Sequence, residues 1–177
     1  MLKKFTNWFS KLITPEPTNL KGGGLAQIKC FKIDEAAIMP SKAHRGPFED
    51  AAFDLFATED ILLQPNERSM VDTKLAFIIQ DRFWIKLRER SGLANKGIHV
   101  LGGVIDSGYT GSVRVILYNS DKEPLLIPYG KAIAQFTVEM LVGVDIKEIT
   151  FNDFYGYNKE RERGCAGFGS TDVKRNK

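Results

Sequence analysis

The spacing of apolar residues along the chain changes near Leu25. In residues 1–24 apolar positions recur every three or four residues, as on one face of a helix: Phe5, Trp8, Phe9 and Leu12. Prolines and a glycine triplet follow, so this segment is predicted to be a short amphipathic helix and a linker. It could bind a membrane surface or a partner's groove. We favour packing on its own body or on a neighbouring subunit, because one short helix with few charges is a weak membrane signal.

After Leu25 the apolar residues alternate with polar ones, which is typical of strands. The strand-forming stretches are FWIKLR, VRVILY and AIAQFTVEML, at 83–88, 113–118 and 132–141. Turn-rich segments separate them, at 64–67, 107–111 and 120–124. Many short strands, with no convincing ten-residue amphipathic helix among them, predict an all-β sandwich, jelly roll or barrel. We place this β domain at residues 25–160 and a flexible tail at 161–177.

Composition and missing motifs narrow the function classes. The chain of 177 residues fits one domain with its own core. Lys and Arg number 25 against 22 Asp and Glu, a net charge of +3, so no stable nucleic-acid binding is expected. Cys30 and Cys165 have no CxxC spacing, and the sequence has only two histidines that could join them as metal ligands, so no zinc site is expected. We expect both cysteines to be free thiols in a reducing, cytoplasmic compartment. The sequence contains no bilayer-length apolar run, P-loop, GxSxG elbow or HExxH motif.

Two polar clusters precede residue 100. Asp54 lies in the apolar segment AAFDL, where an aspartate is more often a turn or cap residue than a ligand. In RERSGLANKGI, Arg90, Ser91 and the backbone around Gly92 could offer an anion a forked cation and short-range donors. The same segment could instead be a solvated loop with a helical turn.

Three further clusters follow. Asp106 begins an Asp-Ser-Gly run, which by itself favours a hairpin turn. Gln135 lies in a strand predicted to be buried, so its amide either has structural partners or is directed at a ligand. The segment RGCAGFGST, at 163–171, carries glycines, hydroxyls and an arginine, which suit phosphate groups but also a flexible tail.

The order and spacing of these clusters are more specific than any one of them. The segments AAFDL, RSGLANKGI, GVIDSGYTGSV, GKAIAQF and RGCAGFGST resemble the five ordered motifs of the homotrimeric all-β dUTPase family, over most of residues 51–171. The resemblance implies a jelly-roll subunit, active sites shared between three subunits, and a tail that closes over a neighbour's site. The implied reaction is Mg²⁺-assisted hydrolysis of dUTP to dUMP and pyrophosphate by water attack on the α-phosphorus. It keeps uracil out of DNA and supplies dUMP for dTMP synthesis.

The resemblance also assigns roles to the third motif and the residues before it. Asp106 matches the catalytic aspartate, which orients and deprotonates the attacking water. Tyr109 matches the tyrosine under the deoxyribose, whose ring leaves no space for a 2'-hydroxyl. The segment from His99 to Gly103, with Val100, matches the hairpin that reads uracil through its backbone. Val104 and Ile105 are also predicted to bind substrate.

The remaining motifs are implied to meet the phosphates and the metal. Arg90, Ser91 and Gly92 match the phosphate-chain motif, and Gln135 matches the residue that fixes the α-phosphate and the water. Asp54 matches the acidic residue near Mg²⁺, where we expect a role through water or by orienting an arginine. In the tail Phe168 would stack on uracil, and Arg163, Ser170 and Thr171 would meet the β and γ phosphates. Gly169 would be a further substrate-binding residue.

The sequence departs from the family pattern at several positions: Ala52, Phe53, Gly108, Lys131, Ala132 and Ala166. The departures at Gly108 and Lys131 bear on turn geometry and subunit contacts.

Two alternatives to this prediction are considered. dCTP deaminase shares the fold and the trimer but has a proton-shuttling glutamate where this chain has Ile116, and an isoleucine cannot move a proton. A binding or regulatory protein on the same scaffold would have no need of Asp106, Tyr109 and Phe168 together.

Overall fold

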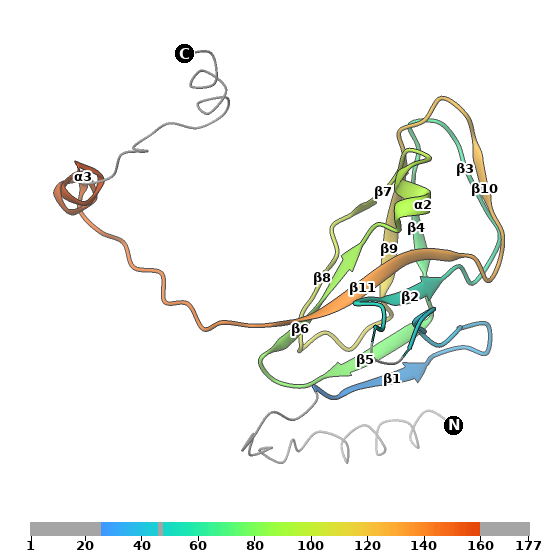
Figure 1. The fold of residues 1–177 in the computed structure, drawn as a ribbon, viewed down its shortest axis with the longest axis horizontal. Coiled ribbons are helices and arrows are strands. Elements are labelled where there is room, and N and C mark those ends of the chain that lie inside the picture. The colour runs from blue at the N-terminus through green and yellow to red at the C-terminus, as the bar shows by residue number, and fades with distance from the viewer. Residues whose placement is uncertain (1–25, 46–47, 160–177) are drawn as a thin grey trace, which may run out of the picture. The chain divides into compact units, whose positions relative to one another are not determined.

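The structure, a computed structural model, describes residues 26–45 and 48–159 (Figure 1). The predicted amphipathic helix and the residues of the predicted tail lie outside them. The elements in chain order are β1 (Ile28–Lys32), β2 (Phe53–Phe56), β3 (Ile61–Leu63), β4 (Arg68–Asp72), β5 (Leu75–Ile79), β6 (Phe83–Arg88), α2 (Ser91–Ala94), β7 (Ile98–Leu101), β8 (Val104–Ile105), β9 (Arg114–Asn119), β10 (Leu125–Ile127), β11 (Ala132–Met140) and α3 (Phe151–Lys159).

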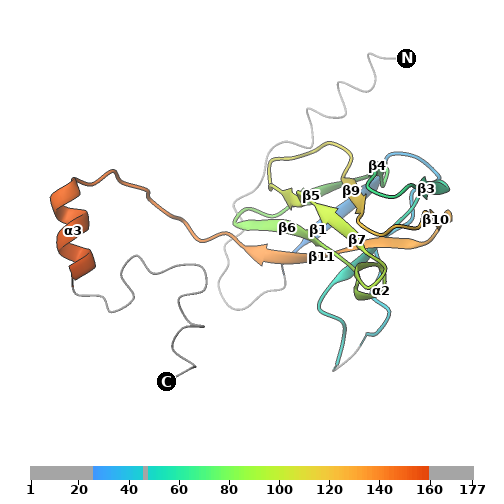
Figure 2. The same cartoon turned by 90° about the horizontal axis from the view of Figure 1, so that it is seen from above.

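The described strands pair into small antiparallel sheets. β1 pairs with β5 and β3 with β10, while the two larger sheets have the orders β2-β11-β6-β8 and β4-β9-β7. Figures 1 and 2 show β11, in orange, running through the β unit next to β6. The prediction of an all-β fold is confirmed, and within the described residues no helix is long and apolar enough to cross a membrane.

One apolar core lies between these sheets. Along β9 buried and less buried positions alternate, with Val115 and Leu117 fully enclosed. Successive side chains of a strand point to opposite faces, so each sheet contributes one apolar face. Phe136 of β11 stacks on Phe53 at 5.3 Å between ring centroids and meets Phe77 edge-on at 5.5 Å. The core therefore ties β11 and β2, which carry predicted site residues, to the rest of the β unit.

The strongest strand predictions are confirmed. β6 covers the predicted stretch at 83–88, β9 is shifted by one residue at each end, and β11 ends one residue earlier than predicted. The predicted turn at 64–67 closes with a hydrogen bond of 3.1 Å from the Glu67 amide to the Gln64 carbonyl. Alternation thus located the strands well where one face is buried.

The chain divides into two compact units, Met1–Leu141 and Val142–Lys177, and the second is described as far as residue 159. Its helix α3 was not predicted, because aromatic residues and Gly156 give the segment little helix propensity. A capping interaction begins it: the Asp153 amide donates to Thr150 Oγ1 at 3.3 Å, and that hydroxyl donates to the Asp153 carboxylate at 2.6 Å. The predicted boundary after residue 160 stays a prediction.

Candidate active site

Three strands bring polar side chains to one face of a sheet. Gln135 of β11 is paired with Asp54 of β2 on one side and with Arg88 of β6 on the other. Residues directly opposite each other in antiparallel strands have their side chains on the same face. These three residues therefore form a row across the sheet, with one strand spacing, about 4.8 Å, between neighbours. We call Asp54, Gln135 and Arg88 the polar row.

Arg90 follows β6 and forks onto one end of the polar row. Its Nε donates to Asp54 Oδ1 at 2.8 Å and its Nη2 to Oδ2 at 3.2 Å. The two side chains are 33% and 18% exposed, so the pair is only partly shielded from water. Two parallel contacts fix the plane of the guanidinium as well as its position. Asp54 thus orients an arginine, which is one of the two roles expected for it.

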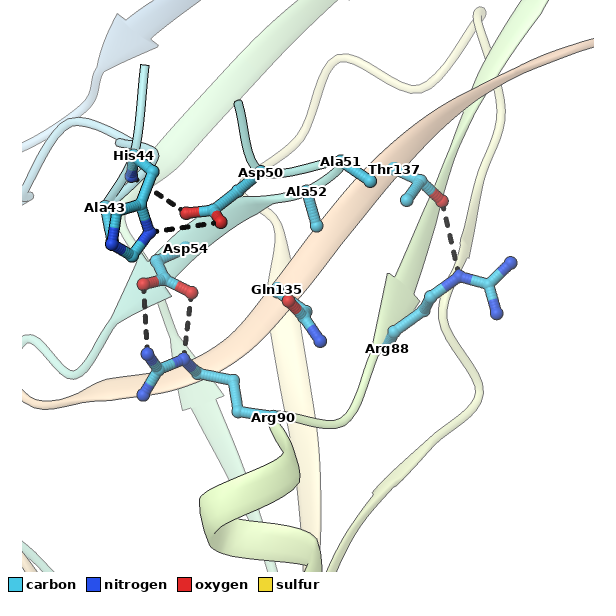
Figure 3. A pocket seen from close by; sticks show the side chains of 10 residues that line it. All are labelled: Ala43, His44, Asp50, Ala51, Ala52, Asp54, Arg88, Arg90, Gln135 and Thr137. Carbon is cyan, nitrogen blue, oxygen red and sulfur yellow. Dashed lines mark hydrogen bonds and ion pairs between the residues drawn. The ribbon is translucent and has the colours of Figure 1, made fainter. Parts of the chain in front are cut away.

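An open groove of about 520 Å³ lies over the polar row (Figure 3). This volume is within the usual range for small-molecule sites. Besides the polar row and Arg90, the groove is lined by Ala43, His44, Asp50, Ala51, Ala52 and Thr137. Two hydrogen bonds between His44 and Asp50 stabilise one wall of the groove. The His44 amide donates to Asp50 Oδ2 at 2.9 Å, and the Asp50 amide donates to the His44 carbonyl at 3.2 Å. The hydrogen bond from the His44 backbone lowers the pKa of Asp50.

Gln135 lies at the centre of the groove and is half-buried. Its Nε2 donates to the Glu89 carbonyl at 2.6 Å. A carboxamide nitrogen has two hydrogens and the oxygen can accept, so one donor and one acceptor remain for a ligand. Both roles considered for Gln135 are therefore compatible. The contact with Glu89 orients its side chain, and the amide can still bind phosphate or water.

Ser91 and Gly92 begin the single turn of α2. The amides of Leu93 and Ala94 both donate to the Arg90 carbonyl at 2.9 Å. The helical turn that was one reading of this segment is therefore present. Anion binding by this segment is still compatible with the turn. The turn fixes the backbone directly after Arg90 and leaves Ser91 exposed.

The predicted uracil hairpin joins two sheets. Between β7, which pairs with β9, and β8, which pairs with β6, the chain turns at Gly102 and Gly103 with φ of +70° and +100°. A Cβ at Gly103 would lie 3.0 Å from Leu87 Cβ and 3.2 Å from the Leu87 carbonyl oxygen. The Leu87 amide donates to the Gly103 carbonyl at 2.8 Å. Conformation and space both require glycine at 103, so the hairpin is fixed closely against β6.

The other hairpin residues lie along the same two strands. His99 Nε2 is 3.0 Å from Ser120 Oγ, and the Val100 amide donates to Glu89 Oε1 at a long 3.4 Å. Val104 and Ile105 form β8. The backbone of β7 is therefore held by β9, and that of β8 is held by β6.

Asp106 is the first residue of a hairpin turn, as its local sequence indicates. The Tyr109 amide donates to the Asp106 carbonyl at 3.0 Å, and the Tyr109 hydroxyl donates to the Ser112 carbonyl at 2.9 Å. The phenol ring covers Gly111, where a Cβ would lie 2.6 Å from the Tyr109 oxygen. The Asp106 side chain is exposed, and within the described residues no hydrogen bond or ion pair occupies it. The turn is ordered while its carboxylate stays available.

The Asp106 turn does not reach the groove of its own subunit. Ile105 is paired with Ile85, so the register places Asp106 level with Trp84, whereas Gln135 is level with Arg88. Four residues along a strand amount to about 13 Å, and two strand spacings add about 10 Å across the sheet. The predicted base and the predicted α-phosphate residue therefore belong to separate places on one chain.

The residues present suit a magnesium ion held mainly by phosphates. Within residues 26–45 and 48–159 no group of three or more His, Cys, Asp or Glu side chains could hold a metal ion. Both Asp54 oxygens accept hydrogen bonds from Arg90, so this carboxylate is already paired with a cation. Mg²⁺ commonly keeps several waters and takes its other ligands from substrate phosphates, and this donor set fits that mode.

Sequence reasoning missed several groove residues, and the tail could not be placed. The groove is also lined by Arg88, Thr137, His44 and Asp50. Their place there depends on the strand register and on the closure of the loop, which the sequence alone does not give. The one available signal was that Arg88 stands two residues before Arg90, on the same face of an extended strand. The predicted tail residues lie outside the described part of the chain: Arg163, Phe168, Gly169, Ser170 and Thr171.

Comparison with known proteins agrees with the motif pattern. The sequence model of the dUTPase family matches residues 35–172. The deoxyuridine 5'-triphosphate nucleotidohydrolase of Nautilia profundicola is 37% identical over 148 residues, which are 82% of this chain and 98% of the relative. That of Clostridium kluyveri is 38% identical over 143 residues, 79% of this chain and 94% of the relative. The chain belongs to the dUTPase family.

Solved structures show the same fold. The dUTPase of Staphylococcus bacteriophage 80alpha with dUPNHPP is 25% identical and has a TM-score of 0.65, over 81% of this chain and 97% of that chain. A mutant dUTPase of phage phi11 of S. aureus, solved with a structural Mg(II) ion, is 23% identical with a TM-score of 0.63, over 70% and 96% of the two chains. The expected dUTPase-like, all-β jelly roll is therefore confirmed.

Proposed function

We propose that this protein hydrolyses dUTP to dUMP and pyrophosphate. The observation that carries the proposal is the groove in which Gln135 lies beside the Arg90–Asp54 fork. A fixed guanidinium and a carboxamide with a spare donor suit a phosphate chain. Membership of the dUTPase family makes dUTP the substrate.

Each part of the substrate meets a different part of the chain. Gln135 holds an α-phosphate oxygen, while Arg90, with Ser91 and Gly92 beside it, meets the phosphate chain. The hairpin from His99 to Gly103 reads uracil with backbone groups, and Val104 and Ile105 follow it at the substrate. Tyr109, held by its hydroxyl over Gly111, presents the face of its ring to the deoxyribose and leaves no room for a 2'-hydroxyl.

Asp106 accepts the proton of the attacking water. Its carboxylate is exposed and without a cationic partner in the described residues, so proton acceptance breaks no ion pair. A positioned general base contributes about 10²- to 10⁴-fold to such a reaction. A bound Mg²⁺, held by the phosphates and through water by Asp54, would draw charge from the phosphate oxygens.

The active form is a homotrimer in which the Asp106 turn of one subunit completes the groove of another. The separation of Asp106 from Gln135 within one chain supports this arrangement. The tail from Arg163 to Thr171 then closes over the site as a lid, with Phe168 on uracil. Contact with a partner or another subunit through residues 1–24 is a further part of the proposal.

The enzyme works in a reducing compartment such as the cytoplasm. Cys30 is a free thiol, and burial raises its pKa to about 11. At neutral pH this cysteine stays protonated and unreactive, which suits a structural role in a reducing environment.

Deamination of dCTP is the disfavoured alternative. Ile116, where that reaction would need a proton-shuttling glutamate, lies in β9 opposite Met70 and Leu101. All three side chains are apolar, so this position offers no group that can carry a proton. A purely regulatory role is equally disfavoured, because it would leave the exposed Asp106 without a purpose.

A substrate panel tests the proposal. Pyrophosphate release is measured with dUTP, dCTP, dTTP and UTP in the presence of Mg²⁺, for the unaltered chain and for Asp106→Asn. We expect turnover of dUTP alone, and an Asp106→Asn variant that binds dUTP but is nearly inactive. Turnover of dCTP, or of none of the four, would refute it.

A further inference from the structure

Arg88 occupies the end of the polar row opposite the Arg90–Asp54 fork. It is paired with Gln135 across β6 and β11, and its side chain is 46% exposed at the groove. Figure 3 shows Gln135 between Arg88 and Arg90. The Arg90 and Arg88 side chains therefore start on either side of Gln135, and the Arg88 guanidinium extends toward Thr137. None of the roles given above uses Arg88.

The Arg88 guanidinium is held in place but has donors to spare. Its Nη2 donates to Glu139 Oε1 at 2.8 Å and its Nε to Thr137 Oγ1 at a long 3.4 Å. Thr137 in turn donates to the same Glu139 oxygen at 3.1 Å. A guanidinium has five N–H donors and these contacts use two. The hydrogen bond from Arg88 also lowers the pKa of Glu139, so the carboxylate remains charged and keeps the guanidinium oriented.

The two groove arginines differ in how firmly they are engaged. Arg90 makes two contacts with Asp54, which is 18% exposed, whereas Arg88 makes one with Glu139, which is 31% exposed. An exposed single-contact ion pair contributes little, so an anion can share or replace it. Arg88 is thus the more adaptable cation of the two.

We propose that Arg88 binds the β- and γ-phosphates of the substrate, the part that leaves as pyrophosphate. The inference rests on the proposed hydrolysis of dUTP, with Gln135 at the α-phosphate. From that anchor, with Arg90 at the α-phosphate end of the chain, the triphosphate runs along the polar row toward Arg88. The contact is charge-assisted and adds affinity for triphosphates but none for the monophosphate product.

Calorimetric titration of the full-length chain with Mg²⁺ tests this. The probes are the non-hydrolysable α,β-imido analogue of dUTP and, separately, dUMP. For Arg88→Gln we expect the Kd of the imido analogue to rise roughly 10-fold, as for the loss of one hydrogen bond to a charged group. The Kd of dUMP should not change. Arg88→Lys keeps the charge without the fork and should recover part of the loss.

Two matched variants separate phosphate binding from a structural role. Glu139→Gln breaks the same ion pair but keeps the cation, so it should leave affinity for the analogue unchanged or higher. Lys86→Gln removes a charge from the same face of β6, outside the groove-lining residues, and should have no effect beyond general screening.

The opposite results would overturn the proposal. An unchanged Kd of the analogue in Arg88→Gln would do so, as would equal weakening by Arg88→Gln and Glu139→Gln. Equal weakening toward dUMP and the analogue would place the contact elsewhere. A failure of dUTP hydrolysis itself is distinguishable, because the unaltered chain would then show no turnover.

Discussion

The two sides of β6 are prepared for different tasks. On the β11 side each polar side chain of the groove has a fixed partner: Asp54 with Arg90, Gln135 with the Glu89 carbonyl, and Arg88 with Glu139. On the β8 side the backbone of the turn is fixed, but the Asp106 carboxylate has no partner within the described residues. A binding groove gains from side chains already held in place, because less ordering is left to do on binding.

A base has the opposite requirement. The proposed base must be free to meet water, and the Asp106 carboxylate is exposed, whereas both Asp54 oxygens already accept from Arg90. The two regions also lie too far apart to act on one phosphate within a single chain. This separation is what the proposed homotrimer would resolve, by joining the Asp106 turn of one copy to the groove of another.

The largest expected effect comes from mixing two inactive variants. Asp106→Asn lacks the proposed base and Arg90→Gln lacks one of the two groove arginines. Alone, Asp106→Asn should lose about 10²- to 10⁴-fold in kcat. When the two are unfolded and refolded together, random pairing should reassemble about a quarter of the sites with both halves intact. Pyrophosphate release from dUTP measures the recovery.

The control is the same two variants mixed without unfolding. They should stay inactive if subunits do not exchange. Should the co-refolded mixture also stay inactive while its oligomer matches the unaltered one, both halves of the site must come from one chain.

A smaller effect is expected when the fork is replaced by a single charge. Arg90→Lys keeps the charge beside Asp54 but loses the second contact, so we expect roughly a 10- to 100-fold lower kcat/KM. Arg114→Lys is the matched control, because Arg114 approaches Asp72 only to 3.8 Å and lies outside the groove. Steady-state kinetics on dUTP would show the difference. Similar losses in both variants would mean that the fork has no special role.

The sequence predicted the parts of the site that are local. Alternation located β6 and β11, and the residues around Asp106 predicted its turn, because each depends only on near neighbours. The family resemblance added which of these residues are expected to carry out chemistry. It anticipated that Asp54 could orient an arginine.

The contacts that the sequence did not predict depend on the register in which the strands pair. The contact between Asp54 and Arg90 joins residues 36 apart, and the pairing of Arg88 with Gln135 joins residues 47 positions apart. Shifting a strand by one residue would turn each of these side chains to the other face. The pattern of apolar residues fixes which face is buried but not which residues meet across it. For this reason Arg88 could not be assigned to the groove before the strands were paired.

The rigidity of the hairpin can be tested at Gly103. Gly103→Ala places a Cβ 3.0 Å from Leu87 Cβ at a φ of +100°, so we expect a loss of about 1–3 kcal/mol in unfolding free energy and a higher KM for dUTP. Gly108→Ala is the control, because a Cβ there meets no atom within 4 Å. Urea unfolding and steady-state kinetics measure the two effects. Equal stability of the two variants would contradict a hairpin held tightly against β6.

The smallest effect separates the two parts of Tyr109. Tyr109→Phe removes the hydroxyl that donates to the Ser112 carbonyl but keeps the ring, which is 44% exposed. One hydrogen bond of this kind contributes about 0.5–1.5 kcal/mol, and exposure puts this one at the lower end. We therefore expect a slight loss of stability and unchanged preference for dUTP over UTP, since in the proposed site the ring excludes the 2'-hydroxyl by its bulk. Tyr109→Ala should lose that preference, measured as the ratio of kcat/KM for the two nucleotides. If the Phe variant accepted UTP as well as the Ala variant does, the hydroxyl and its hold on the turn, rather than the ring, would decide the choice of sugar.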